Sequence, residues 1–184
     1  SRSRFAARFN SGAGPMEEIC QACGKSHDSL AVAIPVSLPT QAAMISPKRR
    51  SKRVWTNDEM CAVDGERFYV YGSVSLSIHD HPGNFTWGAW AEVDEETFLW
   101  FDDHMETEGR ESQGPFRGTL GTDIPFYSCT LGMPLTVHIE PVGLRPLFVL
   151  DDLDHDLARD QSNGVSAARV LEFKAWFGAL RAGP

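Results

Sequence analysis

Residues 61–80, CAVDGERFYVYGSVSLSIHD, decide the fold of this chain of 184 residues. Asp64-Gly65 is a dipeptide that favours a tight hairpin turn. After this turn, apolar side chains continue at every second position through Val74, Leu76 and Ile78. This is the period of a β-strand with one buried face. The stretch therefore predicts a hairpin whose second strand is long.

The flanking segments extend this hairpin into a sheet. The residues HPGN at 81–84 are typical of a turn, and a strand is predicted over 85–93, where a glycine permits a bulge or a close backbone approach. Further strands are predicted over 135–141 and 145–150. Residues 31–45 favour an extended connection, and residues 109–129 favour an ordered loop with short extended pieces.

Two helices are predicted where a capping residue precedes apolar side chains at helical spacing. The first begins after Asp94 and ends at Gly109, and the second begins after Ser166 and runs through Leu180. The predicted apolar positions are Phe98, Phe101 and Met105 in the first helix and Val170, Phe173, Ala175 and Phe177 in the second. The order of elements predicts an α+β fold, with an antiparallel sheet and helices packed on one face.

Length and composition favour one domain. We expect residues 1–15, a stretch rich in Gly, Ala, Ser and Arg, to be a disordered leader or tag, and residues 16–184 to form a single α+β domain. No run approaches the roughly 18 apolar residues that a membrane span requires. With 42% hydrophobic and 23% charged residues, the composition is typical of a soluble globular protein.

The formal net charge is −8, with 17 basic and 25 acidic side chains. A negative surface repels phosphate groups and steers basic partners, which disfavours nucleic acid and favours another protein, a basic one included. The one basic run, PKRRSKR at 47–53, is interpreted as a solvated loop or a first helical turn.

A hook of cysteines and histidine lies at residues 19–30, ICQACGKSHDSL. Cys-x-x-Cys-Gly is typical of a zinc knuckle, in which two thiolates on a tight turn approach one tetrahedral ion. A complete site is permitted with Cys20, Cys23, His27 and Cys61 as ligands, and thiolate and imidazole ligands favour zinc. We therefore predict a structural zinc at these four residues. The sequence has no second Cys-x-x-Cys pair, so Cys61 and His27 would have to complete the site.

Two alternatives for the hook stay open. Cys20 and Cys23 can be small buried side chains, or a redox dithiol, although no βαβ pattern surrounds them. Because the cysteines are few and unevenly spaced and no signal peptide is evident, we expect a reducing, cytoplasmic location.

Three further groups carry functional hypotheses. His79 and His81 fit one face of a strand, as in some metal sites, but a solvated turn is favoured. His155 lies among carboxylates in DDLDHDLARDQ, where capping of a short helix by His155 or Asp154 is favoured over catalysis. Trp87 and Trp90 are candidates for a ligand groove, with packing in the core as the alternative.

Four segments taken together resemble the bacterial domain of unknown function 2199 family: CQACGKSHDSL, DEMCAVDGERFYVYGSVSLSIHD, FTWGAWAEVDEETF and TVHIEPVGLRPLFVLDDLDHDLARDQSNGVS. The resemblance groups Cys61 and His27 with the hook. It also marks Trp87, Trp90, Arg145, His155 and Gln161 as a candidate ligand or partner surface. Tyr71 stands where an arginine is usual in that family.

The resemblance implies a bacterial source but no activity. The favoured function is a non-enzymatic protein-interaction module stabilised by structural zinc, since no recognisable catalytic set is present. The alternative is a metal-dependent hydrolase that uses zinc at the hook or the group of His79, His81 and His155.

Overall fold

The computed structural model describes residues 18–19, 26–27 and 30–183, with side chains from residue 30 onward. Cys20 and Cys23 of the predicted hook lie outside the described residues, as does the side chain of His27. The helices are α1 (Thr40–Ala43), α2 (Pro47–Arg53), α3 (Glu95–His104), α4 (Asp156–Asn163) and α5 (Ala167–Ala182), with a short 3-10 helix at Arg110–Ser112. The strands are β1 (Glu18–Ile19), β2 (Ser26–His27), β3 (Ala33–Ile34), β4 (Val54–Thr56), β5 (Met60–Val63), β6 (Arg67–Ser77), β7 (Asn84–Val93), β8 (Phe116–Leu120), β9 (Pro134–His138) and β10 (Leu147–Leu150).

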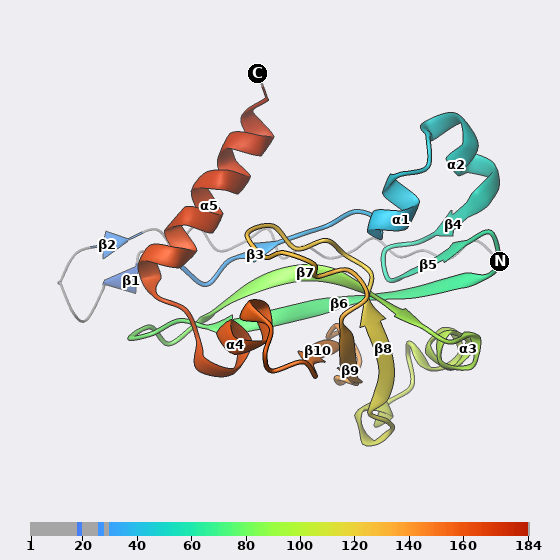
Figure 1. Cartoon of the computed structure of the whole chain (residues 1–184). Helices are drawn as coiled ribbons and strands as arrows, with labels where there is room; N and C mark the ends of the chain where they lie inside the picture. Colours follow the sequence, from blue (N-terminus) through green and yellow to red (C-terminus); the bar gives the residue numbers. More distant parts are fainter. Residues whose placement is uncertain (1–17, 20–25, 28–29, 184) are drawn as a thin grey trace.

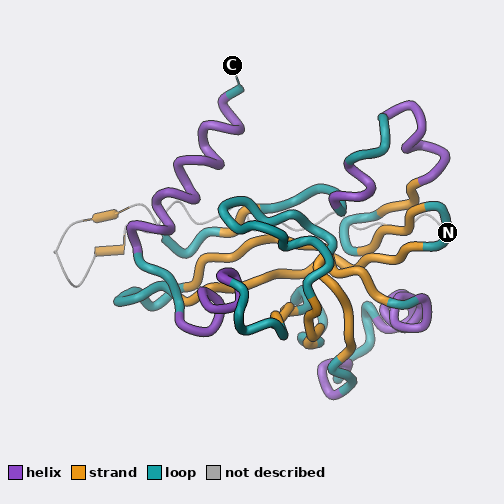
Figure 2. The backbone as a smooth tube through the Cα atoms, viewed as in Figure 1, coloured by secondary structure: helices purple, strands orange, loops and turns teal. Residues whose placement is uncertain are grey.

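Five strands close into a barrel. Each strand from β6 to β10 pairs antiparallel with the next, and β10 returns to β6 in a parallel contact between Leu147 and Ser73. The chain is therefore a mixed helix and sheet protein, as predicted, but its sheet is not an open layer with helices on one face. The difference arises from β8, predicted as part of a loop, and from the parallel contact, for which no local pattern exists (Figures 1 and 2).

Gly72 allows the barrel to close. Along one edge of β6, residues 67–70 pair with β5, and the edge then passes to β10 at Ser73. A Cβ atom at Gly72 would lie 2.5 Å from the Phe148 ring and 2.6 Å from the Pro146 carbonyl oxygen. Only a residue without a side chain lets β10 approach this closely.

The long β6–β7 hairpin extends beyond the barrel and carries additional strands. β5 and β4 add to the edge of β6, and β3 pairs parallel with β7 at Thr86 and Trp87. At Gly88 a Cβ atom would lie 3.0 Å from the Ile34 carbonyl oxygen and would overlap the Tyr71 hydroxyl. The glycine in the predicted strand therefore serves a close backbone approach, one of the two roles expected for it.

Two apolar clusters lie on opposite faces of this sheet, because successive side chains of a strand point to opposite sides. The main core takes Trp87, Ala89 and Ala91 from β7, whereas Trp90 belongs to a second cluster. The members of the second cluster are Ala42, Cys61, Val63, Tyr69, Tyr71 and Trp90. The large aromatic content of the hairpin thus divides between two cores.

The helix caps confirm the predicted starts of α3 and α5. Asp94 accepts a hydrogen bond of 2.7 Å from the Thr97 backbone N–H, and Ser166 accepts one of 3.2 Å from Arg169. The predicted burial in the last helix is confirmed at Val170 and Phe173. The prediction is wrong at Ala175, which is exposed.

The basic run forms α2, in agreement with its interpretation as a helical turn facing water. Arg50 donates hydrogen bonds of 2.9 Å to the carbonyl oxygens of Ala43 and Ile45, and Arg53 pairs with Asp64. Among the helices of the described residues, none combines the length and the apolar character that a membrane crossing requires.

We expect Asp94 to contribute to stability at neutral pH. Hydrogen bonds from the Thr97 side chain and backbone N–H hold the pKa of its carboxyl below the ordinary value of 3.8. Its contribution is therefore complete above pH 3.8 and is lost as the pH falls through the lower pKa of the folded state. Asp94→Ala should lower the free energy of unfolding at pH 7 by about 1 kcal/mol.

Asp94→Asn keeps a neutral cap. It should flatten the dependence of the free energy of unfolding on pH, measured by chemical denaturation between pH 7 and pH 3. An unchanged acid dependence in Asp94→Asn would contradict this role.

Candidate functional site

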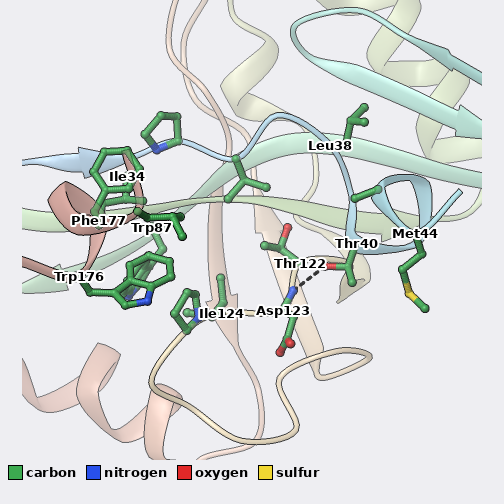
Figure 3. A pocket seen from close by; sticks show the side chains of 15 residues that line it. Ile34, Leu38, Thr40, Met44, Trp87, Thr122, Asp123, Ile124, Trp176 and Phe177 are labelled. Atoms are coloured by element: carbon green, nitrogen blue, oxygen red, sulfur yellow. Dashed lines mark hydrogen bonds between the residues drawn. The ribbon is translucent and has the colours of Figure 1, made fainter. Parts of the chain in front are cut away.

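An open apolar groove lies between the barrel and the C-terminal half of α5. Its volume is about 460 Å³. It is lined by three segments, namely residues 34–44 around β3 and α1, the loop at 122–125, and the side chains of Trp176, Phe177 and Leu180 from α5 (Figure 3). Segments that are far apart in the sequence thus form one hollow.

Trp87 of β7 also lines the groove and is only 1% exposed. Its ring centroid lies 5.1 Å from that of Phe173 and 6.5 Å from that of Trp176, so it links the groove to the root of α5. The indole N–H of Trp87 is buried and has no hydrogen-bond partner among the residues that the structure describes. Trp87 is therefore both a core residue and a groove residue, which joins the two predictions made for it.

The loop of residues 121–130 forms a fixed wall. The Thr40 N–H donates to the Gly121 carbonyl oxygen, and the Asp123 N–H donates to the Thr40 hydroxyl, both at 2.9 Å. The Thr130 hydroxyl donates to the Asp123 carboxylate at 3.0 Å and accepts from the Ile124 N–H at 2.9 Å. These bonds hold the loop against α1 and order it before any ligand binds.

The backbone of this loop is strained next to α5. Phe126 and Cys129 adopt φ angles of +72° and +57°, a region that non-glycine residues rarely occupy. The Phe126 ring packs 5.0 Å from Phe173, and the Arg169 guanidinium lies 5.3 Å from its centroid. Such strain persists only where surrounding contacts fix the conformation.

The α5 wall is apolar and becomes exposed toward its C-terminal end. Only Val170 and Phe173 of α5 are buried, and beyond them the helix projects from the barrel (Figure 1). Leu180 is 64% exposed, and Met44 on the opposite wall is 79% exposed. A helix face of this kind is normally buried against another element.

The groove offers few polar groups. Its polar side chains are Thr40, Thr122 and Asp123, and the two threonine hydroxyls already accept hydrogen bonds from the backbone of Asp123 and Trp90. Within the described ranges, no three His, Cys, Asp or Glu side chains are grouped so that they could hold a metal ion. This arrangement can bind apolar groups, but it assembles no catalytic set.

The residues marked by the family resemblance do not form one surface. Trp90 lies in the second cluster, with its ring centroid 4.9 Å from that of Tyr71. Arg145 stacks on Tyr71, because its guanidinium lies 4.6 Å from the centroid of the Tyr71 ring. It also forms an ion pair of 3.2 Å with Glu59. Tyr71 is thus a stacking partner for Arg145 and also lies beside Trp90.

His155 and Gln161 have structural contacts around α4. The His155 Nδ1 atom accepts from the Leu157 N–H at 3.1 Å, so His155 caps α4 as favoured, and its Nε2 atom lies 2.7 Å from the Ser128 carbonyl oxygen. The Gln161 amide accepts from the Leu150 N–H at 2.9 Å and donates to the Phe148 carbonyl oxygen at 2.7 Å. Gln161 therefore supplies the hydrogen bonds that a neighbouring strand would otherwise make with the backbone of Phe148 and Leu150 in β10.

The histidines proposed for a hydrolase do not gather into a site among the described residues. His79 Nε2 lies 2.9 Å from the Asn163 carbonyl oxygen, and His81 Nδ1 accepts from the Gly83 N–H at 3.0 Å. His79 therefore contacts the end of α4, whereas His81 supports the backbone of its own turn, in agreement with the favoured turn.

Cys61 lies within the second cluster and is fully buried. Burial raises the pKa of its thiol to about 11, against a smaller opposing effect from a hydrogen bond with Thr56. In this apolar and aromatic enclosure Cys61 packs as a small apolar side chain, and its role as a zinc ligand stays a prediction. Zinc bound by Cys20, Cys23 and His27 stays a prediction, because those side chains lie outside the described residues.

Comparison with known proteins identifies a family over most of the chain. The family DUF2199, described as an uncharacterized protein conserved in bacteria, matches residues 19–165. The chain belongs to this family. Neither the curated proteins nor the solved structures contain a match. The DUF2199 match covers the barrel and α4 and ends before α5, so the groove combines two walls of the family region with a third wall outside it.

Gln161→Ala should lower the free energy of unfolding by about 1–3 kcal/mol, because it leaves a donor and an acceptor of β10 unsatisfied. Ser162→Ala, at an exposed neighbouring position of α4, is the matched control and should have little effect. Urea denaturation of the two variants measures the difference. Equal stabilities would show that the Gln161 bonds do not hold β10.

Zinc analysis of the purified protein distinguishes the two interpretations of Cys61. If the hook binds zinc, Cys23→Ser should lose the metal, whereas Cys61→Ala should keep it and lose stability through the vacated volume in the second cluster. Loss of zinc from both variants would place Cys61 among the ligands. A wild-type protein without zinc would contradict the metal site itself.

Proposed function

We propose that the chain is a non-enzymatic protein-interaction module whose groove takes an apolar segment of a partner protein. The observation that carries this proposal is the open, apolar groove beside the projecting half of α5. Exposed apolar side chains stand on both of its walls, at Met44 and Leu180. Contiguous apolar surface of this kind on a folded protein is typical of an interaction site.

The lining favours a protein segment over a small polar ligand. Sites for small ligands position several polar groups around the ligand, and here the hydroxyls of Thr40 and Thr122 are already engaged by backbone N–H groups. Tryptophan and phenylalanine side chains are enriched in protein interfaces, and methionine adapts to varied apolar surfaces. A hydrophobic groove with these residues is suited to an amphipathic helix.

The groove is also ordered in advance. Its loop wall is held by the bonds between Thr40, Asp123 and Thr130, and the root of its helix wall is held by Phe173 in the core. A binding surface that is already ordered loses less conformational entropy when a partner binds. A structural zinc at the hook, proposed from the Cys-x-x-Cys-Gly pattern of Cys20 and Cys23, would add stability to the N-terminal part of the chain.

A photo-activated cross-linking amino acid at position 180 or at position 44 should capture the same partner in cells of the bacterium that encodes the chain. Position 153 is the matched control, because Leu153 is 65% exposed and Leu180 is 64% exposed. Trp176→Ala should weaken capture from position 44 while the fold, measured by circular dichroism, is retained. Equal adducts from positions 153 and 180, or none from either groove position, would contradict the proposed function.

A further inference from the structure

We propose that the partner segment is acidic at both ends of its apolar centre, an inference that rests on the proposed function of the groove. The charges beside the groove differ from the net charge of the chain. Although the whole chain carries −8, cationic side chains without an ion-pair partner among the described residues stand near both of its ends.

The first cationic end is the start of α2. Arg50 donates to the carbonyl oxygens of Ala43 and Ile45, which fixes α2 against the part of the chain that lines the groove at Ala43 and Met44. Lys48 and Arg49 precede this anchor and are exposed. Among the described residues neither of them has an ion-pair partner.

The second cationic end is the last turn of α5. The Arg181 guanidinium lies 5.7 Å from the centroid of the Phe177 ring, which lines the groove. Arg181 is exposed and follows Leu180 directly. Arg169, nearer the start of α5, is already paired with Glu172 at 2.8 Å. Arg181 is therefore the α5 arginine that is placed to meet a bound segment.

One group of acidic side chains lies away from the groove. Six carboxylates lie on and just after α3, which in Figure 1 is on the other side of the sheet from α2 and α5. They are Glu95, Glu96, Asp102, Asp103, Glu106 and Glu108. Among the described residues that line the groove, Asp123 is the one carboxylate, and it accepts a hydrogen bond from Thr130. Local charge therefore favours an acidic partner at the groove.

Charge also argues against two other occupants. Residues 1–15 of the same chain carry three arginines and no acidic residue, so they would bring like charge to the cationic ends. The projecting end of α5 from a second copy would bring another Arg181 and the same repulsion. An acidic segment of a different protein satisfies both the apolar lining and the flanking cations.

Two synthetic amphipathic peptides of about 14 residues, with leucines at helical spacing, test the inference by fluorescence anisotropy. One peptide has glutamates at both ends, and the other has lysines at the same positions. The acidic peptide should bind roughly tenfold more tightly at low salt, and the difference should shrink as salt is added. The variant Arg49→Glu/Arg181→Glu should reverse the preference.

Failure of the inference and failure of the proposed function give different results. If both peptides bind equally, or the lysine peptide binds more tightly, and Leu180→Gln weakens binding more than Leu153→Gln, the groove is a binding site but the acidic preference is wrong. If neither peptide binds, or the two leucine variants behave alike, the groove proposal falls together with the inference. Thermal unfolding of each variant confirms that it is folded.

Discussion

The return of β10 to β6 is the contact on which the architecture depends. It consists of one parallel pairing, Leu147 with Ser73, supported by a hydrogen bond of 3.0 Å from the Ser73 N–H to the Pro146 carbonyl oxygen. Gly72 provides the space for this approach. Because so short a contact closes the barrel, the remaining edge of β10 requires another partner, and Gln161 of α4 supplies it.

The groove follows from this arrangement. α4 reaches β10 through Gln161 and continues through Val165 into α5, so the closing strand and the terminal helix are connected by a short stretch of chain. Phe173 then fixes the first half of α5 against Phe85 and Trp87. In the second half, Trp176 and Phe177 are only partly buried against the main core, and Leu180 is left exposed beside the groove.

Features with a local cause were predictable from the sequence. The turn at Asp64-Gly65, the long strand after it and the caps Asp94 and Ser166 each depend on a few neighbouring residues. Barrel closure has no such pattern, since a single parallel pair joins segments far apart in the chain. β8 was missed because Gly118 and the turn residues around the strand dilute its apolar alternation.

The groove could not be read from periodicity alone. Leu180 follows the spacing of a helix that is buried along one side, and only the point where α5 leaves the barrel determines that it stays exposed. A signal was nevertheless present, because the apolar positions of α5 continue for two turns beyond Phe173. The hook, by contrast, has the sharpest motif in the sequence and lies outside the residues that the structure describes.

The family match ends at Val165, between the barrel and the helix that forms one wall of the groove. Ring closure uses β6, β10 and Gln161, all within the matched region, whereas Trp176, Phe177 and Leu180 lie beyond it. Exchange of the second half of α5 would therefore leave the strand pairings that close the barrel in place and rebuild one wall of the groove.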